Sequence, residues 1–454
     1  MTAFDQPGKT DFWFIPLGGT GEIGMNLNLY GHNSQWLIVD CGISFLDELD
    51  KNGFNQSTVI MPDIQFARSL KDKIVGLVVT HAHEDHLGAI HYLWPELGCP
   101  IYTTKFTRQV LLSKLLRANS PAPVIEISPG EPLQLGGFNI DLVAMTHSTP
   151  ETHGLVISTA AGRVFHTADW KLDPAPIIGT PASETILRGL GSLDAVITDS
   201  TNALQPNRAT SEASVHTAML ELIRGMSGRV VVTCFASNIA RLQTLARVAE
   251  QTGRYLGLLG ASLETMYRAA RQSGYLQDVQ TFACRELSYL PGDEVLIVAT
   301  GSQGQPGSAL HRLALAQHQD VSLEAGDHVI FSAKTIPGNE KSIERLLEQL
   351  KLLGVQIWQA EGSNLALHGS GHGGAPELID LFTWTRPSLV VPVHGEPQHL
   401  EANAALAKQA GIPRQLVGRN GDKFDLVRQQ LETGVAPTGV LQVNNDGSIS
   451  SLQT

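Results

Sequence analysis

A short histidine- and aspartate-rich segment, residues 80–88, carries the residue types best suited to metal chemistry. His81, His83, Asp85 and His86 place four potential ligands within six residues. Imidazole nitrogen suits zinc and other first-row metals, whereas carboxylate oxygen also suits harder cations such as manganese. One such cluster cannot fill the coordination shells of two metals, so we expect further ligands from other parts of the chain.

The residues just before this cluster predict a rigid support for it. Residues 73–80 form a short, apolar, β-branched run that is typical of a buried strand. Other expected strands also end in a residue that could bind metal or support a ligand. These strand-end residues are Asp40, His147, Asp169, Asp199 and His394. Asp40 is also compatible with an ordinary surface position, whereas His394 is a natural ligand for a second metal.

The composition of the 454 residues is that of a globular protein with large cores, since 42% are hydrophobic and 17% are charged. A net charge of −12 argues against a broad surface that coats nucleic acid, although a metal centre with a local basic groove could still hold phosphate. The N-terminal residues lack a basic start and an apolar signal core, and no apolar run is long enough to span a bilayer. We therefore expect a cytoplasmic protein without membrane partners.

After residue 208 the pattern changes to alternating helices and strands. This alternation predicts a doubly wound α/β unit with a mainly parallel sheet. One loop of this unit, residues 299–307, follows a strand and contains Thr300 and Ser302 among glycines. Backbone N–H groups of such a turn can cradle phosphate, and an ordinary turn between strand and helix is the alternative.

These segments together resemble the metallo-β-lactamase superfamily, its β-CASP branch and, within that branch, the ribonuclease J family. The resemblance covers about residues 12–430. The motifs that carry it are Leu17-Gly18-Gly19-Thr20-Gly21-Glu22-Ile23-Gly24-Met25-Asn26, the His81–His86 segment, Asp199-Ser200-Thr201-Asn202, Thr300-Gly301-Ser302-Gln303-Gly304, Ile336-Pro337-Gly338-Asn339-Glu340, Ser370-Gly371-His372-Gly373 and Pro392-Val393-His394-Gly395-Glu396. The fold that the resemblance implies is α/β: a metallo-β-lactamase αββα sandwich with an inserted doubly wound α/β β-CASP domain.

The resemblance also implies a ligand set for two divalent ions per chain. The ligands of the first ion would be His81, His83 and His147. Those of the second would be Asp85, His86 and His394. Asp169 would bridge the two ions, and Asp40 would support the ligand loop by hydrogen bonding. Zinc is the expected metal, and the same nitrogen and oxygen donors also suit manganese.

The activity that the resemblance implies is cleavage of single-stranded RNA, as a 5′–3′ exonuclease, an endonuclease or both. A water activated by the two metals would attack the phosphodiester bond, with Asp85, Asp199 and His372 as the expected catalytic residues. His372 would act near the leaving oxygen and Asp199 would hold the local geometry. The candidate phosphate-binding residues are Thr300, Ser302, Ser370, Gly371 and His372.

Two other functions use similar sequence features. A small-molecule dimetal hydrolase, such as a thioesterase or a lactonase, could carry nearly the same ligands, but the insert and His372 count against it. An inactive RNA-binding scaffold is the third hypothesis. Degenerate family members lose ligands, and this sequence retains every ligand position.

The expected domain organisation has four parts. Residues 1–208 and 361–440 form the first and the returning parts of the metallo-β-lactamase domain, 209–360 form the β-CASP insert, and 441–454 form a polar tail. Members of the ribonuclease J family usually carry a further C-terminal domain that contributes to oligomerisation, and this chain is expected to lack it. A homodimer or a homotetramer is the expected assembly.

Overall fold

A computed structural model describes residues 5–49, 55–336 and 338–452. Within these residues, two large β-sheets pack face to face. The first sheet contains, in spatial order, β22 (Gln430–Glu432), β21 (Lys423–Asp425), β1 (Trp13–Gly18), β2 (Leu27–His32), β3 (Gln35–Val39), β6 (Ile74–Val79), β7 (Ile101–Thr103) and β8 (Val124–Glu126). The second contains β20 (Arg414–Gln415), β19 (Leu389–Val393), β13 (Ala195–Asp199), β12 (Arg163–His166), β11 (His153–Ser158), β10 (Phe138–Ala144) and β9 (Leu133–Leu135).

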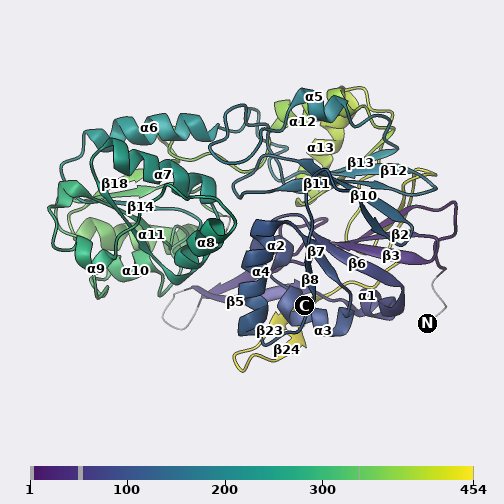
Figure 1. Cartoon of the computed structure of the whole chain (residues 1–454), viewed down its shortest axis with the longest axis horizontal. Coiled ribbons are helices and arrows are strands. Elements are labelled where there is room, and N and C mark those ends of the chain that lie inside the picture. The colour runs from purple at the N-terminus through teal and green to yellow at the C-terminus, as the bar shows by residue number, and fades with distance from the viewer. Residues whose placement is uncertain (1–4, 50–54, 337, 453–454) are drawn as a thin grey trace.

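The core between these sheets contains apolar side chains from both, such as Phe14 and Leu37 from the first and Ile140 and Ile197 from the second. Helices cover the two outer faces (Figure 1). On the first sheet they are α1 (Gln65–Ser69), α3 (Ile90–Leu97) and α4 (Lys105–Arg117). On the second they are α5 (Glu184–Arg188), α12 (Ala375–Thr385) and α13 (Pro397–Gln409). This four-layer arrangement confirms the predicted αββα sandwich.

The predicted insert is also confirmed, because a separate parallel sheet lies between β13 and β19 in the chain. Its strands, in spatial order, are β15 (Tyr255–Leu259), β16 (Val295–Ala299), β14 (Val230–Thr233), β17 (His328–Phe331) and β18 (Gln356–Gln359). Its helices are α6 (Glu212–Arg224), α7 (Ile239–Gln251), α8 (Ala261–Gln272), α9 (Cys284–Leu287), α10 (Ala309–Ala314) and α11 (Glu340–Leu352). Val230 and Val232 pack into one core and Val231 into another, as period-two alternation requires.

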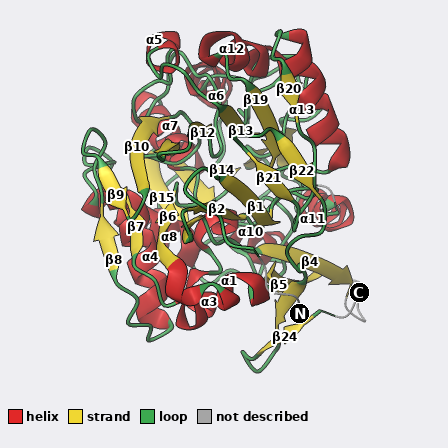
Figure 2. Cartoon of the chain, turned by 90° about the vertical axis from the view of Figure 1, so that its right-hand side faces the viewer, coloured by secondary structure: helices red, strands yellow, loops and turns green. Residues whose placement is uncertain are grey.

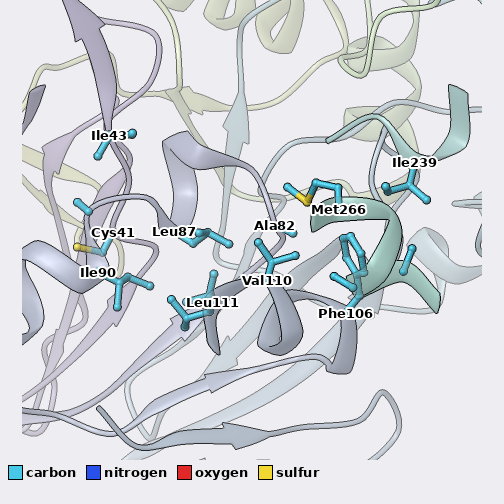
Figure 3. Close-up of a cluster of buried hydrophobic side chains, with 14 of the residues drawn as sticks. Cys41, Ile43, Ala82, Leu87, Ile90, Phe106, Val110, Leu111, Ile239 and Met266 are labelled. Atoms are coloured by element: carbon cyan, nitrogen blue, oxygen red, sulfur yellow. The ribbon is translucent and has the colours of Figure 1, made fainter. Parts of the chain in front are cut away.

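The insert shares a core with the sandwich. Leu87, close to the ligand loop, belongs to the same apolar cluster as Val110 and Phe106 of α4. Figure 3 shows that this row of side chains continues to Met266 of α8 and Ile239 of α7, both in the insert. The apolar support of the ligand loop is therefore built in part by the insert.

A small sheet was not anticipated from the sequence. It contains, in spatial order, β24 (Ile449–Ser451), β23 (Val440–Val443), β5 (Asn55–Pro62) and β4 (Ser44–Leu49). Figure 2 shows this sheet at the lower edge of the molecule. Strand β24 and most of β23 lie in the segment that was predicted to be a polar tail, and β23 pairs antiparallel with β5. Among the described residues, no helix is long and apolar enough to cross a bilayer.

Close packing of backbone fixes the ligand helix α2 (Glu84–Leu87) against the end of β3. Cys41 N donates to the His86 carbonyl at 2.7 Å, and Asn26 N donates to the Asp85 carbonyl at 2.9 Å. A Cβ atom on Gly42 would lie 1.7 Å from that Asp85 oxygen. Gly42 is required here because any side chain would displace the ligand helix.

We therefore expect Gly42→Ala to lower the free energy of unfolding by about 3 kcal/mol or more, the upper end for steric overpacking. Chemical denaturation of the variant beside the wild type measures this loss. Gly225→Ala is the matched control, because its Cβ would come no nearer than 3.7 Å to the Leu222 oxygen. Equal stability of Gly42→Ala and wild type would contradict the packing argument.

Candidate metal centre

The predicted ligands meet at one edge of the sandwich because the strands before them end there. Strands β12, β13 and β19 run parallel, and Asp199 at the end of β13 pairs with Val393 at the end of β19. His394 therefore enters the site beside Asp199, although the two residues are far apart in the sequence. The loop after β6 carries His81 to His86 and meets this edge from the first sheet.

One group of potential ligands comprises His81, His83, His147 and Asp169, with one donor atom of each within 4.8 Å of the others. His83 Nδ1 lies 3.2 Å from His81 Nε2 and 3.0 Å from His147 Nε2. Burial lowers the pKa of His81 and His147 well below the ordinary value and that of His83 to about 4. These imidazoles are therefore neutral at pH 7, the form that binds a metal.

A second group comprises Asp85, His86, Asp169 and His394, again within 4.8 Å. Asp169 Oδ2 lies 3.3 Å from His86 Nε2, and Asp169 Oδ1 lies 2.9 Å from His394 Nδ1. Asp85 Oδ2 lies 3.3 Å from His394 Nε2. Asp169 thus belongs to both groups and lies between them, as expected of a bridging carboxylate.

The second group carries an excess of buried negative charge. Burial opposes protonation of His86 and His394, but the nearby carboxylates, Asp169 first, raise the pKa of both imidazoles well above the ordinary value. The pKa of Asp169 is in turn held well below its usual range, against the effect of burial, by His394, His86 and His372. A divalent cation offers the positive charge that this group otherwise draws from protons.

The donors fit divalent metal ions. Within the described residues, the buried ring nitrogen His394 Nε2 has no well-oriented hydrogen-bond partner, although Asp85 Oδ2 lies 3.3 Å from it. Such an unpaired buried polar atom is costly unless a ligand satisfies it. The set mixes imidazole nitrogen with carboxylate oxygen, which suits first-row divalent ions. The buried histidine and aspartate cluster is therefore consistent with binding of divalent metal.

Asp40 lies directly beneath the ligand loop and is fully buried. Its Oδ1 accepts a hydrogen bond from Thr80 N at 2.8 Å, and its Oδ2 accepts from Thr80 Oγ1 at 2.9 Å. His86 Nδ1 also lies 2.8 Å from Oδ2, which leaves His86 Nε2 to face Asp169. Asp40 thus holds Thr80 and orients the His86 ring, and its support of a metal ligand stays a prediction.

His372 and Asp199 form a hydrogen-bonded pair beside the ligand groups. His372 Nδ1 lies 2.6 Å from Asp199 Oδ2, and His372 Nε2 lies 3.9 Å from Asp169 Oδ2. Thr201 fixes the other oxygen of Asp199, because its Oγ1 and its N donate to Oδ1 at 2.6 and 2.8 Å. Burial opposes protonation of His372, but Asp199 raises its pKa above the ordinary value.

The structure separates the predicted phosphate-binding residues. Ser370 and Gly371 line a cavity next to His147, together with Lys171 and Asn238. Thr300 and Ser302 line neither this cavity nor the one beside His394. The Ser302 side chain is buried, and Thr300 N and O bond to backbone groups in the insert. The role predicted for Thr300 and Ser302 therefore has no support from these two cavities.

Several residues that shape the site were missed in the sequence analysis. Asn26 Nδ2 lies 3.1 Å from both the Asp85 carbonyl and His86 Nε2. Thr201 and Asn202 contact Asp199 and the turn that carries His372. A usable signal existed for these last two, because they directly follow Asp199 at the end of a strand. Asn26 lies at the end of the glycine-rich motif of residues 17–26, but only the fold shows that this turn contacts the ligand helix.

Three family models match this chain, and they follow the order of the sandwich, the insert and the returning part of the sandwich. The family model described as "Beta-lactamase superfamily domain" matches residues 35–234, and "Ribonuclease J, beta-CASP domain" matches 227–350. The model "Zn-dependent metallo-hydrolase RNA specificity domain" matches 366–416. A solved protein of unknown function from Enterococcus faecalis superposes with a TM-score of 0.65 at 16% identity, covering 91% of this chain and 99% of that one. That likeness supports the fold alone.

Curated relatives match nearly the whole chain. Ribonuclease J of Sinorhizobium meliloti is 38% identical and covers 98% of this chain and 79% of the relative. Ribonuclease J of Mycolicibacterium smegmatis is 37% identical, with coverage of 90% and 74%, and that of Thermus thermophilus is 36% identical, with 95% and 77%. The ligand groups, the inserted domain and these relatives agree, and the chain belongs to the ribonuclease J family of metal-dependent ribonucleases.

Proposed function

We propose that this chain hydrolyses phosphodiester bonds of single-stranded RNA with two bound Zn²⁺ ions, from a 5′ end, internally or both. The observation that carries the proposal is the shared carboxylate of Asp169, which joins two ligand groups and faces the His372–Asp199 pair. A dimetal site beside a proton donor suits the hydrolysis of an anionic phosphodiester. Membership of the ribonuclease J family supports RNA as the substrate.

In this proposal the ion pair is held by the two ligand groups. The first ion would be held by His81, His83 and His147, the second by Asp85, His86 and His394, and Asp169, which belongs to both groups, would serve both. Two such ions, when bound, supply a deprotonated water at neutral pH and neutralise phosphate charge. Asp40 keeps His86 in the orientation that presents Nε2 to the site.

His372 is the residue that we assign to proton transfer. Asp199 accepts at His372 Nδ1, so that the proton on Nε2 points toward the ligand groups. The raised pKa keeps a proton on this imidazole near neutral pH, which suits donation to the leaving ribose oxygen. Ser370 and Gly371 would contact the phosphates of the bound RNA in the adjoining cavity.

The alternatives have less support. A thioesterase or lactonase has no use for the His372–Asp199 pair beside an RNA-specificity segment. An inactive scaffold would not need to retain both complete ligand groups. Several finer points stay our predictions. They are the choice of zinc over manganese, a homodimeric or homotetrameric assembly, a cytoplasmic location and the domain limits at residues 208, 360 and 440.

The test is an assay of purified protein with trace Zn²⁺ or Mn²⁺. Its substrates are single-stranded RNA with a 5′-monophosphate and a 3′ label, 5′-hydroxyl RNA, single-stranded DNA and a thioester. Release of mononucleotides from RNA indicates an exonuclease, and internal fragments indicate an endonuclease. Intact RNA together with turnover of the thioester would contradict the proposal and favour a small-molecule hydrolase.

Asp85→Ala removes a ligand of the second group alone. We expect the variant to keep the first ion and to lose the second. RNA cleavage should be at least ~1000-fold slower, because one metal cannot stabilise both the attacking and the leaving oxygen. Metal analysis of the purified protein gives the occupancy, and the RNA assay gives the rate. Full occupancy of both sites in the variant would show that Asp85 is not a ligand.

Asp199→Asn tests the pair with His372. Loss of the carboxylate removes the charge that raises the pKa of His372, so the donor is less protonated near neutral pH. We expect kcat to fall by ~10²–10⁴-fold, with both ions retained. Asp141→Asn, an exposed position on β10, makes the same charge change as a control. A kcat like that of the wild type would contradict the role of the pair.

A further inference from the structure

The turn formed by Ser370, Gly371 and His372 connects the ligand groups to the cavity beside them. The Gly371 carbonyl lies 2.6 Å from His147 Nδ1, and His372 Nδ1 lies 2.6 Å from Asp199. Ser370 and Gly371 line the cavity. Whatever holds this turn therefore decides how its hydroxyl and its imidazole face a bound substrate.

Asn202 holds the turn at both ends. Its side-chain Nδ2 lies 2.8 Å from Ser370 Oγ and 2.9 Å from the His372 carbonyl oxygen. A carbonyl can only accept, so the amide nitrogen, rather than the amide oxygen, must face His372. The NH₂ group has two hydrogens, and the two contacts use both of them.

The Ser370 hydroxyl can act toward a substrate only as a hydrogen-bond donor. Its oxygen accepts from Asn202 Nδ2 and also from His372 N at 3.1 Å. A hydroxyl has two acceptor lone pairs and one hydrogen, so both lone pairs are used and only the hydrogen remains. Among the residues that the structure describes, no acceptor receives this hydrogen, and Ser370 lines the cavity.

We propose that Asn202 is a positioning residue that commits the Ser370 hydroxyl to donate into this cavity, toward a phosphate oxygen of the RNA. The inference rests on the proposed function, which supplies the phosphate. A phosphate oxygen carries negative charge and accepts hydrogen bonds, so a hydroxyl restricted to donation matches it. Asn202 need not touch the substrate, because it acts through Ser370.

Two substitutions of Asn202 should affect the Ser370 hydroxyl differently. In Asn202→Asp the carboxylate cannot donate, and it accepts the Ser370 hydrogen, so the hydroxyl turns away from the cavity. In Asn202→Ala the hydroxyl loses one fixed donor but stays free to rotate toward the substrate. The expected order of KM is therefore wild type, then Asn202→Ala, then Asn202→Asp.

The experiment measures kcat and KM with 5′-phosphorylated, 3′-labelled single-stranded RNA, together with metal content and thermal stability. We expect Asn202→Asp to raise KM ~10-fold or more, as loss of a hydrogen bond to a charged group implies. Both ions should remain bound. Asn207→Asp, an exposed position on the same loop, makes the same charge change and should leave KM as in the wild type.

A double-mutant cycle with Ser370→Ala decides whether Asn202 acts through Ser370. Without the hydroxyl, Asn202→Asp should raise KM by less than ~2-fold over Ser370→Ala alone. Fully additive effects, a KM for Asn202→Ala as high as that for Asn202→Asp, or loss of a metal ion in Asn202→Asp would overturn the inference. A wild-type protein that does not cleave RNA would instead overturn the proposed function.

Discussion

The structure depends on one buried carboxylate that faces imidazoles from both sheets. Asp169 is 2% exposed and lies within 4 Å of His81, His86, His147, His372 and His394. Burial of a charge is costly unless partners and hydrogen bonds compensate it. Both sheets must therefore bring their strand ends to the same point, and the face-to-face packing of the sandwich does so. The packing of the two sheets and the arrangement of the imidazoles thus both serve to compensate the buried charge of Asp169.

The contacts around the ligands are mainly those of backbone and short polar side chains. Asp40 fixes His86, Asn26 fixes the helix that carries Asp85, and Gly371 fixes His147. Such groups have few rotamers, so they hold their partners at little cost in side-chain entropy. A metal centre built this way is preorganised by the fold before any ion binds.

Much of the fold could be predicted from the sequence, and so could the residues that the fold brings together as two groups of potential ligands. Strand ends followed by His or Asp are local signals, and the motif that runs from His81 to His86 lies within one loop. Asp40 was found for the same reason. Contacts between distant segments left no such signal: Asn26 reaches Asp85 only because β1 and β2 place the glycine-rich turn there.

Two predictions from local patterns have different outcomes. The loop with Thr300 and Ser302 has the composition of a phosphate-binding turn, and its binding of phosphate stays a prediction. The segment after residue 440 was predicted to be a polar tail, but Val440-Leu441-Gln442-Val443 pairs with β5 as strand β23. For β23 the tertiary environment, an edge of β5 available for pairing, decides the outcome.

The parallel pairing of β13 with β19 has a consequence for the order of synthesis. His394 follows the whole inserted unit, so the second ligand group has no complete set until the ribosome has passed that residue. The long intervening segment adds little to the closure entropy, because each doubling of a loop costs only about 0.6 kcal/mol. A nascent chain that has paired β1, β2, β3 and β6 already holds His81 to His86, but it lacks His394, so the second ligand group is still incomplete. The second ligand group is therefore completed only after the whole insert has been synthesised.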